Sequence, residues 1–174
     1  MVADLLDYNA LTAGIVAVRH DRLDAVPLLS EIIYQWKLTQ CESVNEPVLE
    51  LPDNPLYVRG DPMRIQQIIV NLLNNSVQAA LPGQSLQLTI RLAAAPQGKA
   101  LISVSDDGPG IPPEIRGRIF EAFFRSSGKQ SLLRGLGLGL TFSRLLAEAM
   151  GGSLELGEAQ APGCAFVLTL PLEP

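Results

Sequence analysis

The fold of this chain is decided by the stretch RGLGLGLTFSRLLAEAMG, residues 134–151. Glycine occupies alternate positions at its start, and apolar residues then recur at the spacing of an amphipathic helix until Gly151 and Gly152 end it. A glycine-rich turn before a helix leaves backbone N–H groups unpaired where the helix dipole favours negative charge. The stretch can therefore hold phosphate, although similar glycine patterns also occur in ordinary loops and close-packed turns.

The composition is that of a globular domain. The chain has 174 residues, 47% hydrophobic and 18% charged, which suits one domain with a substantial core. The net charge of −5 argues against a nucleic-acid surface. We expect neither a membrane span nor a signal peptide. Cys41 and Cys164 have no metal-ligand spacing and indicate a reducing compartment, and the single histidine argues against structural zinc.

The order of predicted elements indicates a two-layer α/β sandwich with helices on one face of a sheet. Asp24 and Asp61 are predicted helix N-caps with proline in the first turn, and Trp36 is predicted to be in the core. The predicted helices cover residues 25–40, 62–80 and 140–150, after a short apolar helix end at 3–13. The predicted strands cover residues 15–19, 48–51, 56–59, 86–92, 100–104, 153–156 and 165–170.

Two asparagines in the second helix are candidates for metal ligands. Asn71 and Asn75 are four residues apart, so they project from one helix face. Asparagine is a mediocre helix former, so such a pair needs a partner. The spacing fits two interpretations equally well, and both stay open. The two side chains form a solvent-facing edge of the helix, or their carbonyl oxygens are directed at Mg²⁺.

Asp106 begins the segment DDGPGIP, which directly follows a predicted strand. Its composition is typical of a turn. It also fits a site in which one carboxylate accepts a hydrogen bond from a ligand amine, such as the 6-amino group of adenine, because an ionised carboxylate only accepts. Gly108 and Gly110 would then allow the backbone to approach the ligand closely.

Residues 119–134 combine three phenylalanines with Arg125, Lys129 and Arg134 but have poor helix periodicity. This favours a mobile flap whose cations neutralise a triphosphate on closing, over a core segment. His20 lies in a charged run and is predicted to be a surface residue. No Walker motif is present, and no Ser-His-Asp triad stands out.

Together these segments resemble the catalytic and ATP-binding domain of bacterial two-component sensor histidine kinases, in the GHKL superfamily. The resemblance runs from about Asp24 to Pro171. QQIIVNLLNNSVQAA (66–80) is similar to the N box, DDGPGIP (106–112) to the G1 box, IFEAFFR (119–125) to the F box, GLGLGL (135–140) to the G2 box, and PGCAFVLTLP (162–171) to the closing strand.

The resemblance implies an α+β Bergerat fold, with a mixed, mostly antiparallel sheet, about three helices on one face, and a mobile ATP lid at 119–134. It implies ATP and Mg²⁺ as cofactors. Asn71 and Asn75 would be the catalytic residues and the Mg²⁺ ligands, with Asn75 the main one, and Asp106 would bind the adenine amine. The implied nucleotide-binding set is Asn71, Asn75, Asp106, Gly108, Gly110, Ile111, Lys129, Arg134, Gly135, Gly137, Leu138 and Gly139.

The residue at position 71 bears on the reaction. Hydrolysing members of the superfamily have a glutamate there, which activates water. Asn71 cannot act as a base, which favours transfer of the γ-phosphoryl group to a histidine, already nucleophilic when neutral. The alternatives are a degenerate module that signals by nucleotide or partner binding, supported by Leu136 in the G2 box, and an anti-sigma-type serine kinase.

The resemblance also implies partners outside this chain. Residues 1–14 resemble the end of a dimerisation helix, which argues against the serine kinase, and residues 15–174 form the catalytic domain. The accepting histidine would lie on a dimerisation domain of the same full-length protein, a homodimer, with a response regulator receiver domain next in the relay. We expect a cytoplasmic domain, whether or not the sensor is membrane-anchored. Departures from the family pattern include Ser76 for alanine, Gln78-Ala79 for Lys-Tyr and Cys164 for threonine.

Overall fold

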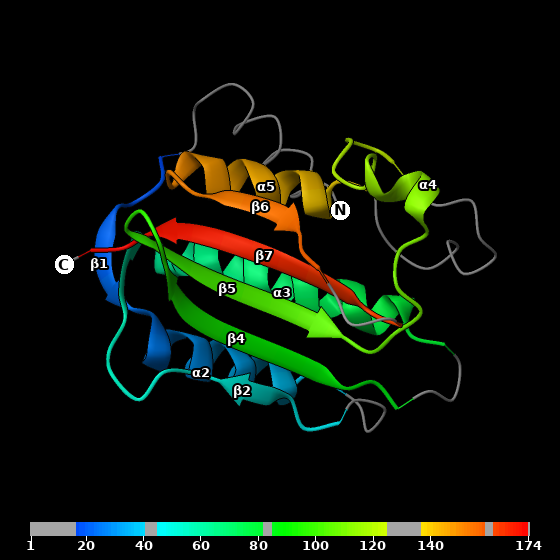
Figure 1. Ribbon diagram of the computed structural model, residues 1–174, viewed down its shortest axis with the longest axis horizontal. Coiled ribbons are helices and arrows are strands. Elements are labelled where there is room, and N and C mark those ends of the chain that lie inside the picture. Colours follow the sequence, from blue (N-terminus) through cyan, green and yellow to red (C-terminus); the bar gives the residue numbers. More distant parts are fainter. Residues whose placement is uncertain (1–16, 41–44, 82–84, 125–136, 159–161, 174) are drawn as a thin grey trace.

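A five-stranded sheet is the centre of the fold (Figure 1). The computed structural model describes residues 17–40, 45–81, 85–124, 137–158 and 162–173. The strand order is β2-β4-β5-β7-β6; β2 runs parallel to β4, and every other neighbouring pair is antiparallel. The strands are β2 (Val48–Glu50), β4 (Leu88–Ala95), β5 (Lys99–Asp106), β6 (Ser153–Leu156) and β7 (Cys164–Pro171). The predicted mixed, mostly antiparallel sheet is confirmed.

A second, two-stranded sheet lies beside the first. It pairs β1 (Asp21–Asp24) with β3 (Tyr57–Gly60) in antiparallel register. An isolated bridge between Val58 and Leu172 connects it to the segment that follows β7. The two strands predicted at 48–51 and 56–59 therefore belong to different sheets.

Three helices cover one face of the large sheet, as predicted (Figure 1). They are α2 (Ala25–Lys37), α3 (Pro62–Ala79) and α5 (Gly139–Ala149), and α3 packs between the other two. A short helix, α4 (Pro113–Arg116), directly follows the turn-like segment DDGPGIP (106–112). No helix in the described ranges is long and apolar enough to cross a membrane.

The core fills the space between the sheet and these helices. The stripe of α3 buries isoleucine and leucine at helical spacing, and alternate residues of β4, β5 and β7 meet it. Trp36 is buried, and its indole N–H donates to the Asn74 Oδ1 atom at 2.9 Å, which connects α2 to α3. Asn74 therefore has a structural role.

The structure corrects the start of the chain. A strand was predicted at 15–19, but the described part of that segment, 17–19, is not a strand, and β1 begins at Asp21. The Arg19 backbone N–H donates to the Asp61 carboxylate instead of to a neighbouring strand. The first helix also ends at Lys37, three residues before the predicted end, where the Thr39 hydroxyl donates to the Trp36 carbonyl.

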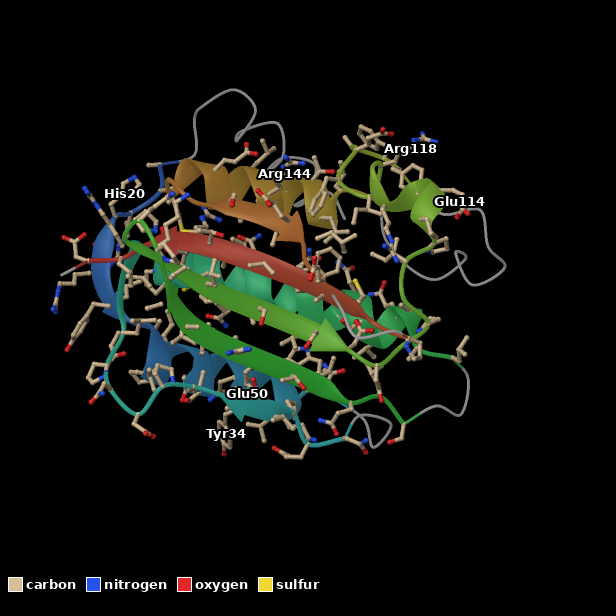
Figure 2. The ribbon with its side chains drawn as sticks, in the orientation of Figure 1. His20, Tyr34, Glu50, Glu114, Arg118 and Arg144 are labelled. Atoms are coloured by element: carbon tan, nitrogen blue, oxygen red, sulfur yellow. The ribbon has the colours of Figure 1, made fainter. Side chains whose placement is uncertain are left out.

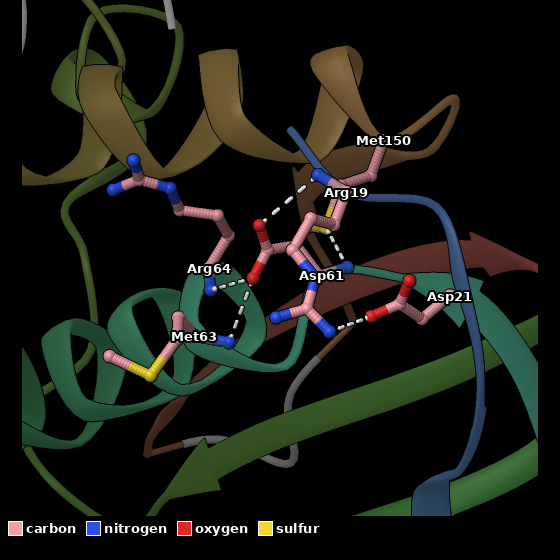
Figure 3. Close-up of polar contacts among 6 residues, drawn as sticks. All are labelled: Arg19, Asp21, Asp61, Met63, Arg64 and Met150. Atoms are coloured by element: carbon pink, nitrogen blue, oxygen red, sulfur yellow. Dashed lines mark hydrogen bonds and ion pairs between the residues drawn. The ribbon is translucent and has the colours of Figure 1, made fainter. Parts of the chain in front are cut away.

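Asp61 joins three separate parts of the chain (Figure 3). Its Oδ1 atom accepts from the backbone N–H groups of Met63, at 3.0 Å, and Arg64, at 3.4 Å, which is the predicted N-cap of α3. Its Oδ2 atom accepts from Arg19 N–H at 3.2 Å, and its own N–H donates to the Met150 sulfur at 3.4 Å, just after α5. The carboxylate thus connects the entering chain to the helix layer.

The pKa of Asp61 reflects this network. Burial of the carboxyl, which is 5% exposed, would by itself raise its pKa. The N–H groups of Arg19, Arg64 and Met63, together with the Arg64 charge, outweigh burial and lower the pKa below its ordinary value. The network therefore stabilises the ionised carboxylate.

We expect Asp61→Ala to lower the free energy of unfolding by about 1–2 kcal/mol, because three backbone donors lose their acceptor. Urea unfolding followed by circular dichroism measures this loss. Asp24→Ala is the matched control, since within the described ranges the Asp24 cap on α2 accepts from one backbone N–H, that of Val26 at 3.1 Å, and its loss should cost less. An Asp61→Ala loss no larger than that of Asp24→Ala would contradict this role.

The loss should also depend on pH. A carboxyl whose folded-state pKa lies below its unfolded value, near 4, stabilises the fold fully above that value. The contribution disappears as pH falls through the folded-state pKa. The difference between wild type and Asp61→Ala should therefore stay constant from about pH 7 to 5 and shrink below about pH 4.

Candidate functional site

Asn71 lies at the closest approach of α3 to α5. Its Nδ2 atom donates to the Ser143 hydroxyl at 2.9 Å, and Ser143 is 1% exposed. Its Oδ1 atom lies against Gly139, the first residue of α5, where an added Cβ atom would come within 2.5 Å of that oxygen. The amide is therefore held with its oxygen directed at the first turn of α5.

Asn75 lies one helical turn further along α3. Its Nδ2 atom is the buried side-chain nitrogen or oxygen that lacks a hydrogen-bond partner among the described residues. An unpaired buried polar group costs about 1–3 kcal/mol, so native proteins rarely keep one without a reason. A ligand that binds beside α3 would give this amide a partner.

Asp106, the last residue of β5, faces α3. Its Oδ2 atom accepts from the Ser76 hydroxyl at 2.6 Å, and its Oδ1 atom accepts from the Gly108 N–H at 3.0 Å. An added Cβ atom on Gly108 would lie 2.9 Å from that same Oδ1 atom. The helix and the turn after the strand therefore hold the carboxylate from two sides.

Position 110 requires glycine because its backbone lies close to that of Gly163. Its φ is +73°, and an added Cβ atom would lie 2.7 Å from the Gly163 carbonyl oxygen. A cleft beside this contact is lined by Ile111, Arg116, Leu156, Gly157, Gly163, Cys164 and Ala165. Residues 106–111 and the start of β7 thus form one wall of the site.

Cys164 is paired with Asp106 across β5 and β7. Burial raises the pKa of its thiol to about 12; the Asp106 charge adds to the rise and the Arg116 charge opposes it. The thiol therefore stays protonated at neutral pH and cannot act as a thiolate nucleophile.

The N-terminus of α5 has no side-chain cap. Asp24 and Asp61 cap α2 and α3, but the N-cap residue of α5 is Leu138, whose hydrocarbon side chain cannot accept a hydrogen bond. Gly137 precedes it with φ +70°. The first turn of α5 therefore has no acceptor from its N-cap side chain, and phosphate binding at this turn stays a prediction.

The described segments on either side of residues 125–136 lie side by side. The Phe123 N–H donates to the Gly137 carbonyl at 3.1 Å, and the Thr141 hydroxyl donates to the Phe120 carbonyl at 2.9 Å. The Arg144 guanidinium on α5 lies over the Phe120 ring. The first residues of the predicted lid therefore contact the start of α5, and residues 125–134 of that lid lie outside the described ranges.

Several predicted residues lie outside the described ranges. These are Arg125, Lys129, Arg134 and Gly135, together with Leu136 and residues 1–14. The other predicted residues lie within the described ranges: Asn71 and Asn75 in the second half of α3, Asp106 at the end of β5, Gly108, Gly110 and Ile111 in the segment after β5, and Gly137, Leu138 and Gly139 at the start of α5. Hydrogen bonds and close contacts join Asn71 to α5 and Asp106 to α3. His20 is exposed beside β1, across the molecule from Glu114 on α4 (Figure 2).

Sequence reasoning missed the two serines that contact this site. Ser76 and Ser143 both occupy the core-facing stripes of amphipathic helices, where an apolar residue is expected. A polar residue at a core-facing position is the signal that could have identified them. The sequence pattern of the helix does not predict which residues they contact.

A hard cation fits the donors at α3. No group of three or more His, Cys, Asp or Glu residues that could hold a metal ion is found in the described part of the chain. The side-chain amide oxygens of Asn71 and Asn75 are oxygen ligands of the type that Mg²⁺ accepts together with phosphate oxygens. The unpartnered atom of Asn75 is its Nδ2 amide nitrogen, an N–H donor that would pair with an acceptor such as a phosphate oxygen and leave Oδ1 for the cation.

Comparison with known proteins gives the class. The model of the family described as histidine kinase-, DNA gyrase B- and HSP90-like ATPases matches residues 60–174, and the chain belongs to this family. It is 36% identical over 173 residues to the sensor protein TorS of Escherichia coli, covering 97% of this chain and 18% of that protein. It is 32% identical over 189 residues to the sensor protein ChvG of Rhizobium meliloti, covering 100% of this chain and 32% of that protein.

Solved structures agree with this assignment. Full-length ShkA in complex with AMPPNP superposes with a TM-score of 0.82 at 27% identity, over 98% of this chain and 35% of that one. The catalytic domain of histidine kinase ThkA superposes with a TM-score of 0.73 at 26% identity, over 88% and 95%. The chain thus has the fold of histidine kinase catalytic domains, and it spans less than a third of the TorS and ChvG sequences.

We expect Gly139→Ala to lower the free energy of unfolding by about 1–3 kcal/mol, although alanine is the better helix former. The added Cβ atom would collide with the Asn71 oxygen, which Ser143 holds in place. Chemical unfolding measures the loss. Gly117→Ala is the matched control, because an added Cβ atom there meets nothing within 4 Å and φ is −67°.

A double-mutant cycle identifies the cause of that loss. In an Asn71→Ala background the collision is removed, so Gly139→Ala should cost little or stabilise the protein. A full Gly139→Ala loss in that background would show that the collision with Asn71 is not the reason for glycine at this position.

Proposed function

We propose that this chain is the ATP-binding kinase domain of a sensor histidine kinase. It would transfer the γ-phosphoryl group of ATP to a histidine on a dimerisation domain, for relay to a response regulator. The observation that carries the proposal is the convergence of Asn71, Asp106 and the uncapped start of α5 around one end of α3. Membership of the ATPase family and the AMPPNP complex of ShkA support it.

Asp106 would select the base. Its two oxygens already accept from Ser76 and from Gly108, and a carboxylate retains lone pairs for one further donor. The 6-amino group of adenine is such a donor. Gly108 and Gly110 would let the base lie close to the backbone, and Ile111, which lines the adjacent cleft, would contribute apolar contact.

Asn71, Asn75 and the first turn of α5 would hold the phosphate side. Mg²⁺, when bound, neutralises phosphate charge, and the Asn75 and Asn71 amides would be its protein ligands. The backbone N–H groups at the start of α5 would donate hydrogen bonds to phosphate oxygens. Lys129, Arg134 and Gly135, in the proposed lid and its hinge, would complete the set.

Asn71 favours a kinase over an ATPase. Its amide nitrogen donates to Ser143, and an amide cannot take a proton from water at this position. A neutral imidazole needs positioning more than activation, so a histidine acceptor does not require that base. We infer that the chain protects bound ATP from water until the acceptor domain supplies a histidine.

The acceptor would be supplied by another part of the full-length protein. We propose that residues 1–14 are the end of its dimerisation helix and that residues 15–174 form the catalytic domain. His20 is exposed beside β1 and lies away from the proposed site, which supports an acceptor elsewhere. We propose a cytoplasmic location for this domain in a homodimeric sensor.

We expect Asp106→Asn to weaken ATP binding by about 2–3 kcal/mol, or ~30- to 150-fold, because an amide donor would face the adenine amine. Isothermal titration calorimetry measures the affinity. Asp107→Asn is the matched control: it makes the same change one residue away, on an exposed carboxylate that accepts from Gln87 N–H. If Asp106→Asn binds ATP as tightly as wild type, Asp106 does not contact the base.

Phosphotransfer distinguishes the kinase from a degenerate module. With radiolabelled ATP, this chain alone should stay unlabelled, and the same chain joined to a dimerisation domain should label the acceptor histidine. Labelling that disappears when this histidine becomes alanine identifies the acceptor. Binding of a non-hydrolysable ATP analogue without any labelling of the joined chain would favour the degenerate module.

A further inference from the structure

Three polar side chains are buried in the described part of the chain, namely Asp61, Ser76 and Ser143. Asp61 caps α3, as its hydrogen bonds show. The two serines each make a hydrogen bond to a residue of the proposed nucleotide site, Ser76 to Asp106 and Ser143 to Asn71. Burying a hydroxyl in a helix stripe costs free energy unless it is paired, so these pairings need a reason.

The Ser76 contact is the shorter of the two. Its hydroxyl oxygen lies 2.6 Å from the Asp106 Oδ2 atom, within the range of strong hydrogen bonds to a charged acceptor. Since an ionised carboxylate can only accept, the hydroxyl donates its proton to Asp106. The Gly108 N–H binds the other oxygen at 3.0 Å, so each carboxylate oxygen has one protein donor.

We propose that Ser76 is a positioning residue that sets base specificity through Asp106, an inference that rests on the proposed function. With a donor on each oxygen, the carboxylate plane cannot rotate freely about its Cβ–Cγ bond. The lone pairs that remain therefore point in one fixed direction. An amine donor that arrives there meets an acceptor that is already oriented, and no conformational freedom is lost on binding.

The direction of the Ser76 hydrogen bond also bears on which bases fit. Because the Ser76 hydroxyl hydrogen is already engaged in the hydrogen bond to Asp106, the Ser76 oxygen can only accept a hydrogen bond from a ligand. A purine with an amine at position 6 faces acceptors that complement it. A purine with a carbonyl oxygen at position 6 would place an acceptor against acceptors, which leaves buried groups unpaired.

The test compares two nucleotides that differ only at position 6. Calorimetry with ATP and with purine ribonucleoside triphosphate, which lacks the 6-amino group, gives an affinity ratio for each variant. In Ser76→Ala, ATP affinity should fall about fivefold to tenfold, while the affinity for the analogue changes less than about twofold. The ratio of ATP affinity to analogue affinity should therefore fall. A purely structural role for Ser76 would lower both affinities and leave this ratio unchanged.

Ser143→Ala is the matched control. It removes a hydroxyl of similar burial from a neighbouring helix, but that hydroxyl contacts Asn71 on the proposed phosphate side. Any loss of affinity in this variant should affect ATP and the analogue by the same factor. A change in the ratio as large as that of Ser76→Ala would show that the ratio does not report on the base, and would overturn the inference.

Ser76→Cys provides a second variant if Ser76→Ala is poorly folded by circular dichroism. It keeps the side-chain volume and replaces the hydroxyl with a weak donor, so the ratio should again fall. A wild-type ratio in the folded Ser76 variants overturns the inference while ATP binding itself persists. Failure of the wild-type chain to bind ATP overturns the proposed function instead, so the two failures are distinguishable.

Discussion

The contact between the Asn71 side-chain oxygen and Gly139 is the constraint on which the site depends. An added Cβ atom at Gly139 would lie 2.5 Å from that oxygen, so the Asn71 side chain of α3 packs directly against the Gly139 backbone of α5. The Ser143 hydroxyl accepts from the same amide and fixes its orientation. Gly139 thus lets the Asn71 side chain reach the start of α5, where Leu138 provides no side-chain cap.

From this junction the rest of the site follows along α3 and α5. One turn beyond Asn71, the same helix presents Asn75, with its unpartnered amide, and Ser76, whose hydroxyl holds Asp106. At the other side of the junction, the Gly137 carbonyl accepts from the Phe123 N–H, so the described segments that flank residues 125–136 meet beside the start of α5.

Local signals in the sequence predicted most of the fold but not the connections between distant segments. Asp61-Pro62 identified the start of α3, and alternation in residues 86–92 and 100–104 predicted the two strands that pair as β4 and β5. The Ser76–Asp106 and Asn71–Ser143 hydrogen bonds join residues that are 30 and 72 positions apart. A pattern among neighbouring residues therefore cannot predict them. The strand predicted at 15–19 was wrong because the Arg19 N–H pairs with the distant Asp61 carboxylate, which local alternation cannot reveal.

The central claim is that one nucleotide lies along the end of α3, with its base at Asp106 and its phosphates at Asn75 and the start of α5. A crystal structure of this chain with Mg²⁺ and a non-hydrolysable ATP analogue tests it most directly. The account predicts a hydrogen bond from the adenine 6-amino group to the Asp106 carboxylate and phosphate oxygens at the first turn of α5. A nucleotide bound elsewhere, or with its base turned away from Asp106, would contradict it.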